Sequence, residues 1–211
     1  MPPELNEWVD RVFGPAIEPY QRLIGLDDAG RPGQAALQRL TKVFENPAIL
    51  LEPYSDESLN RAFWDLSSGA LHVLNDGTIE WASRHRLIQS FETLFRELFA
   101  VRCQPVLSNC SEVGSPINIA CYMWWDFDCW TAAPEPLTRN PMDTAFLESM
   151  ESILTIDHVA CQESALHGLG HWHRAHGAAV EGIIDRFLKR ERYLPARLRD
   201  YACSARCGCV Q

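Results

Sequence analysis

Five of the seven histidines of the chain fall within one short segment, between residues 158 and 176. His167 and His171 stand four residues apart, so on a helix they lie one above the other on the same face, as two ligands of a metal ion would. Glu163 stands one turn before His167 and extends this polar face. The three side chains therefore form a candidate metal site, with zinc as the expected ion.

A different interpretation of the same residues stays open. In a metalloprotease helix of this type, a glutamate directly follows the first histidine, whereas this chain has Gly168. Glu163 and Arg174 can simply solvate the helix face while the histidines hydrogen-bond to neighbouring helices. A chain without a cofactor is thus the first expectation, and a metal-binding protein or metalloenzyme that uses the His-rich helix 163–176 is the alternative.

The cysteines near residue 205 form a second cluster. Cys203, Cys207 and Cys209 follow the pattern Cys-x3-Cys-x-Cys. The first pair has a spacing found in zinc sites, but the third cysteine is closer than is typical, and Cys161 or a histidine would have to supply a fourth ligand. Buried thiols at a packed helix end and a redox-sensitive tail are the other interpretations. Because free cysteine is among the most often buried residues, we expect the buried arrangement.

A segment rich in tryptophan and aspartate offers a different kind of chemistry. Three tryptophans and two aspartates stand within residues 121–130. Aromatic rings beside carboxylates suit an arginine or lysine of a partner, through cation–π contacts and paired charge. The alternative is a core helix whose tryptophans pack between neighbouring helices. The predicted partner-binding residues are Trp124, Trp125, Asp126 and Asp128.

The bulk composition narrows the class of partner and the compartment. The chain has 211 residues and a net charge of −9, which disfavours nucleic acid and anionic membranes and is compatible with a basic protein partner. The N-terminus lacks the features of a secretory signal, and no stretch has the ~18 apolar residues of a membrane span. We therefore expect a cytoplasmic protein with reduced cysteines.

Apolar residues recur at helical spacing along nearly the whole chain, and no segment alternates with the period of a strand. The spacing predicts helices over residues 5–13, 35–44, 55–74, 78–102, 144–156 and 195–205. Two helix–turn–helix units are expected near 55–102 and 157–191, the second turning at Gly177. A proline-containing midsection, 103–142, lies between them. The prediction is one all-α domain over residues 1–211, built of stacked helical hairpins with no significant β-sheet.

The segment Ser-Ala-Leu-His-Gly-Leu-Gly-His-Trp, residues 164–172, resembles the second half of a HEAT-type helical repeat. The resemblance covers 157–191 well and 55–102 loosely. It implies a HEAT-like or irregular α-solenoid and favours partner binding over catalysis. The function expected from the sequence is thus a small acidic protein-binding module, such as an adaptor, an inhibitor or an immunity-type protein, which recognises its partner through an acidic-aromatic surface.

Overall fold

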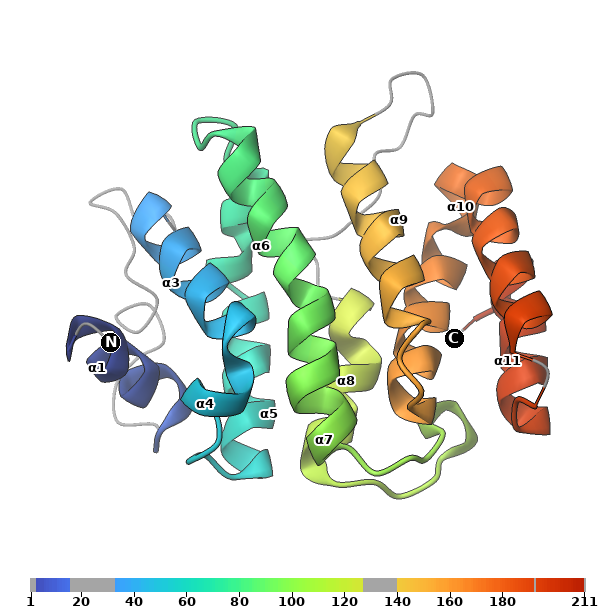
Figure 1. The fold of residues 1–211 in the computed structure, drawn as a ribbon, viewed down its shortest axis with the longest axis horizontal. Coiled ribbons are helices and arrows are strands. Elements are labelled where there is room, and N and C mark those ends of the chain that lie inside the picture. Colours follow the sequence, from blue (N-terminus) through green and yellow to red (C-terminus); the bar gives the residue numbers. More distant parts are fainter. Residues whose placement is uncertain (1–2, 16–32, 127–139, 192, 211) are drawn as a thin grey trace. The chain divides into compact units, whose positions relative to one another are not determined.

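The computed structural model describes residues 3–15, 33–126, 140–191 and 193–210 (Figure 1). Within these ranges the chain forms helices and no strand, which confirms the predicted all-α class. The described residues up to Arg102 form one compact unit, and those from Cys103 onward form a second. No helix in the described ranges combines the length and the apolar character needed to cross a membrane.

The first unit contains a phenylalanine-rich core. Helix α3 packs against α6, and α1 packs against α5. Five fully buried phenylalanine rings form this core. Phe63 contacts Phe13, Phe44 and Phe99, and Phe44 also contacts Phe91. The elements are α1 (Pro3–Phe13), α3 (Gln34–Glu45), α4 (Pro47–Leu50), α5 (Asp56–Ser67), η1 (Ala70–Asn75), α6 (Trp81–Leu94), η2 (Phe95–Phe99) and α7 (Ala100–Arg102).

Two irregularities interrupt the helices predicted for this unit. The helix expected over 55–74 breaks at Gly69, whose backbone is non-helical, and continues as the 3-10 helix η1. The helix expected over 78–102 begins at Trp81 and contains a π-helical turn, η2, in which the rings of Phe95 and Phe99 lie 4.8 Å apart. After this turn, Arg102 donates hydrogen bonds to Asp56 and to the carbonyl of Tyr54.

The second unit is organised around α10, which consists of two helical segments that meet at His176. Helices α8, α9 and α11 and the short helix η4 all pack against it. Its buried side chains include Leu166, Leu169 and Trp172 before residue 176, and Val180 and Ile184 after it. The elements of the unit are η3 (Ser108–Cys110), α8 (Pro116–Tyr122), η4 (Met123–Asp126), α9 (Pro141–Ile153), α10 (Val159–Arg190) and α11 (Ala196–Arg206).

The helical hairpin expected over 157–191 is present, with its turn at His176. The φ of −131° and ψ of 34° at His176 divide α10 into two helical segments. The second segment folds back along the first: His173 Nε2 lies 3.4 Å from Glu181, and Arg190 donates a hydrogen bond to the carbonyl of Leu154, just before the start of α10. Gly177 is not among the described glycines with positive φ, so it does not form the expected left-handed stop. The turn coincides with a contact between His176 Nε2 and the buried carboxylate of Asp143, 2.9 Å away.

Candidate metal centre

Two elements of the second unit bring three potential metal ligands together. Asp126 stands at the end of η4, while His167 and His171 lie one turn apart on α10. His167 Nε2 is 3.0 Å from each carboxylate oxygen of Asp126 and 3.1 Å from His171 Nε2. His171 Nε2 is 3.1 Å from Asp126 Oδ1. We refer to these three residues as the His/Asp site, whose ligand atoms all lie within 4.8 Å of one another.

Gly168 is the residue that allows η4 to approach α10 so closely. A Cβ atom at this position would lie 2.5 Å from Trp125 Cγ and 2.8 Å from Trp125 Cβ, well inside contact distance. The Trp125 side chain therefore packs directly against the backbone of α10 at Gly168. Asp126 follows Trp125 directly, so this packing also sets the position of the carboxylate beside His167.

A chain of two tyrosine hydroxyls lies on the Nδ1 side of the His167 ring, opposite Asp126. Tyr201, on α11, places its hydroxyl 2.7 Å from His167 Nδ1, and the hydroxyl of Tyr122 lies 3.3 Å from that of Tyr201. With a metal ion bound, Nδ1–H would donate to Tyr201 and Tyr201 to Tyr122, so that the lone pair of His167 Nε2 points at the ion; without an ion, Nε2 carries a proton that it donates to Asp126. Burial is the main cause that raises the pKa of Tyr201, so its phenol keeps its proton.

The charges of the site favour an ionised carboxylate. Burial raises the pKa of Asp126, but hydrogen bonds from His167 and His171 outweigh it, so this pKa lies well below its usual range. The hydrogen bond to Asp126 raises the pKa of His171, and burial opposes that rise. The carboxylate is thus available as an anionic ligand across the neutral pH range.

The three ligands of the His/Asp site differ in their exposure to solvent. The side chain of His167 is 1% exposed, that of Asp126 25% and that of His171 43%. Solvent therefore reaches the two outer ligands while His167 is fixed in the interior. An ion held by these three side chains would keep coordination positions that face solvent.

Glu163 does not join this site, so its assignment as a metal ligand is corrected. Its carboxylate accepts hydrogen bonds from the backbone N–H groups of Ser108 (2.8 Å) and Asn109 (2.9 Å) at the start of η3. The residue is fully buried, and burial raises its pKa to about 7 although the two backbone hydrogen bonds lower it. Helical spacing predicts which residues share a face, but a carboxylate one turn away can still turn toward another element.

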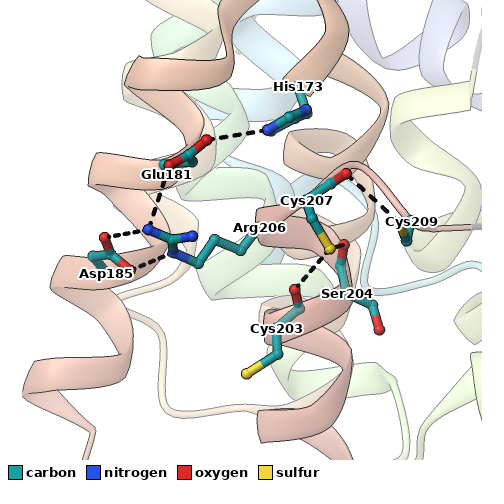
Figure 2. A network of polar contacts seen from close by, with 8 residues as sticks. All are labelled: His173, Glu181, Asp185, Cys203, Ser204, Arg206, Cys207 and Cys209. Carbon is teal, nitrogen blue, oxygen red and sulfur yellow. Dashed lines mark hydrogen bonds and ion pairs between the residues drawn. The ribbon is translucent and has the colours of Figure 1, made fainter.

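The other histidines of the segment lie on different faces of α10. His173 Nε2 is 3.4 Å from Glu181, and Figure 2 shows Glu181 also paired with Arg206, which reaches Asp185 as well. His176 pairs with Asp143, as described above. Neither histidine contacts the His/Asp site.

Cys203, Cys207 and Cys209, in α11 and the turn after it, are exposed, so the expectation of buried thiols is wrong. The Cys207 thiol lies against the carbonyls of Cys203 and Ser204, and Cys209 follows Gly208, whose φ of 70° turns the chain back. Residues 202 and 205 carry the buried face of α11 instead. Seven cysteines are described, and none of these seven forms a disulfide.

The tryptophans predicted to bind a partner lie in the core of the second unit. Trp124 is 0% exposed and Trp125 is 3% exposed, so neither presents the aromatic surface that the sequence suggested. The physical reason is the contact with Gly168, which buries Trp125 against α10. Asp126 faces the two histidines, and Asp128 lies outside the described residues.

Comparison with protein-family models, with curated proteins and with solved structures finds no match for this chain. The resemblance to HEAT-type repeats therefore stays a prediction. Sequence reasoning found His167 and His171 but assigned Asp126 to another role and missed Tyr201 and Tyr122. No local signal connects these residues, because they lie 34 to 45 positions from His167 along the chain.

Proposed function

We propose that this protein binds one divalent transition-metal ion through Asp126, His167 and His171, and that the ion keeps open positions for water or a substrate. The observation that carries the proposal is the mutual spacing of 3.0–3.1 Å between the three kinds of ligand atom. Two ligands each about 2.1 Å from an ion are about 3.0 Å apart at a right angle and about 3.4 Å apart at a tetrahedral angle. The spacing supports three ligands on one face of an octahedron.

This ligand set has a known chemical preference. Two histidines and one carboxylate on one face, with the remaining positions open, are typical of iron(II) centres, and zinc uses a related set with a bound water. The hydrogen bond from His167 Nδ1 to Tyr201 is the kind of second contact that fixes a metal-binding imidazole. The proposed function is therefore a metalloprotein with an exchangeable site, iron(II) being the first expectation and zinc the second.

An ordinary ion pair explains the same residues less completely. A carboxylate that accepts from two histidines needs each imidazole to face the carboxylate, but it does not need the two imidazole nitrogens to face each other. Here His167 Nε2 and His171 Nε2 are 3.1 Å apart. Convergence of both nitrogens on one point supports a shared ion rather than two separate hydrogen bonds.

The test is metal analysis of the untagged protein, followed by removal of the metal and titration with iron(II), zinc and cobalt(II). The wild-type protein is expected to bind one equivalent, and H167A/H171A should lose that equivalent. The matched control is H85A/H173A, which removes two imidazoles that do not contact the His/Asp site. Equal losses in the two double variants, or a wild-type protein that binds no ion, would contradict the proposal.

The protein-binding role expected from the sequence stays a prediction. Burial of Trp124 and Trp125 removes the aromatic part of the surface on which it rested. Nothing among the described residues favours that role over metal binding, so it is not developed further.

A further inference from the structure

The turn that follows α11 brings two exposed thiols together, outside the His/Asp site. Cys207 is the residue that ends α11, and Cys209 stands two positions later, with Gly208 between them. Gly208 has a φ of 70°, and the backbone N–H groups of Gly208 and Cys209 donate to the carbonyls of Ala205 (3.0 Å) and Ser204 (2.9 Å). These two bonds and the left-handed glycine define a Schellman motif, so the turn has a fixed conformation.

The two sulfur atoms lie around the same backbone carbonyls. Cys207 Sγ is 3.3 Å from the carbonyl oxygen of Ser204, which also accepts the N–H of Cys209, and Cys209 Sγ is 3.6 Å from the carbonyl oxygen of Cys207 (Figure 2). Two Cα steps of about 3.8 Å, bent at a left-handed residue, span about 5.5 Å, which a disulfide can bridge. Rotation of the two side chains about their Cα–Cβ bonds can therefore join these sulfurs without moving the backbone.

Contacts with α10 hold the turn in place on both sides of its glycine. A Cβ atom at Gly208 would lie 3.1 Å from Nδ1 and 3.2 Å from Cβ of His173, so the turn packs directly against this side chain. Further along, a Cβ atom at Gly170 would lie 2.6 Å from Cγ1 of Val210, so the residue after Cys209 packs against the backbone of α10. The backbone of the turn is thus fixed, while both thiols face solvent.

We propose that Cys207 and Cys209 form a redox-active dithiol that exchanges reversibly with low-molecular-weight disulfides, and we call this pair the C-terminal dithiol. Exposure lets a small disulfide reach either thiol, and the fixed turn keeps the second thiol close to the first. A disulfide that is exposed and closes so small a ring is of the labile kind, so a small thiol can reduce it again. Cys203 is not part of the pair, because its sulfur is directed away from that of Cys207 (Figure 2).

The exchange consists of two displacement steps at sulfur. The thiolate of one cysteine attacks the small disulfide, forms a mixed disulfide and releases one small thiolate. The thiolate of the other cysteine then attacks the protein sulfur of the mixed disulfide, closes the bond between Cys207 and Cys209 and releases the second small thiolate. The two cysteine thiols are oxidised to one disulfide, the small disulfide is reduced to two thiols, and the two protons pass to the released thiolates.

The test is incubation of the reduced, folded protein with oxidised glutathione, followed by alkylation of the remaining thiols in denaturant, digestion with trypsin and mass spectrometry. Cleavage after Arg199 and Arg206 separates Cys203, in peptide 200–206, from the C-terminal dithiol, which stays together in peptide 207–211. Peptide 207–211 is expected to be unalkylated and to have lost two hydrogen atoms, whereas peptide 200–206 should be alkylated. An excess of reduced glutathione should restore the alkylated form of peptide 207–211.

Single variants separate the two steps of the exchange. C207S and C209S should each stop at a mixed disulfide with one glutathione, because the thiol needed for the second step is absent. The matched control is C203S, which removes the neighbouring exposed thiol and should behave like the wild-type protein.

The contribution of the fold is measured against the isolated peptide 207–211, which has the same two cysteines but lacks the turn. The equilibrium constant for oxidation by glutathione should be about tenfold larger in the folded protein, since the turn holds the two thiols close together. Four outcomes would overturn the proposal: an unreacted peptide 207–211, a mixed disulfide that persists in the wild-type protein, a disulfide that links peptides 200–206 and 207–211, or equal constants for protein and peptide.

Discussion

Two regions in the first half of α10 carry histidines in opposite surroundings. At the start of α10, the His158 ring interacts with the Cys161 thiol and with the carbonyl of Cys103, and Cys103, Cys121 and Cys161 are shielded from solvent. At the His/Asp site, only His167 is buried, and His171 is 43% exposed. The same imidazole side chain thus packs beside buried thiols in one region and lies in a solvent-accessible group of metal-ligand atoms in the other. The side chains that surround each histidine, rather than the histidine itself, make the difference.

Glu163 lies on α10 between the two regions and should make stability depend on pH. Its folded pKa of about 7 lies above the ordinary value of 4.5, so between these values the folded chain holds a proton that the unfolded chain has lost. The stability contributed by this group is therefore present below pH 4.5 and is lost as the pH rises to about 7, by roughly 3 kcal/mol. Unfolding of E163Q from pH 4 to 8 should lack this component. E112Q removes a charge that also raises the pKa of Glu163, but burial is the main cause of that rise, so this variant should retain most of the component.

The packing at Gly168 can be tested by adding one methyl group. G168A should push Trp125 away from α10, destabilise the protein by about 2 kcal/mol and weaken metal binding at the His/Asp site, because Asp126 moves with Trp125. The control is G170A, whose added Cβ would meet the side chain of Val210 instead. Calorimetric titration should show weaker metal binding for G168A only. An unchanged affinity in G168A would mean that the carboxylate is positioned by something else.

The smallest effect is expected from the hydroxyl behind His167. Y201F removes the hydrogen bond to Nδ1 but keeps the ring, so metal affinity at the His/Asp site should fall about tenfold, or about 1.4 kcal/mol. Y122F serves as the control, since its hydroxyl contacts Tyr201 rather than the histidine. A drop of the same size in both variants would point to general loosening of the site.

The sequence predicted what depends on local spacing and missed what depends on distant contacts. Helical periodicity predicted the all-α class and the common helix face of His167 and His171, because both depend on residues one turn apart. The carboxylate of the site could not be assigned, since Glu163 and Asp126 are equally suitable chemically and only the fold brings Asp126 near. Average burial preferences failed for the cysteines: those near residue 205 are exposed, whereas the widely spaced Cys103, Cys121 and Cys161 are buried together.

The π-helical turn Phe95–Phe99 determines where the first unit can lose one residue of its chain. A π-helical turn holds one residue more than the α-helical turn it replaces. Deletion of a single codon within 95–99 would therefore leave an ordinary α-helix with its backbone hydrogen bonds intact. The wider turn absorbs the rotation of about 100° that one additional residue would otherwise impose on the rest of the helix, so Arg102 would still face Asp56 and Tyr54 after the deletion. Phe95–Phe99 is therefore a place where the first unit can lose one residue while the end of the helix keeps its orientation.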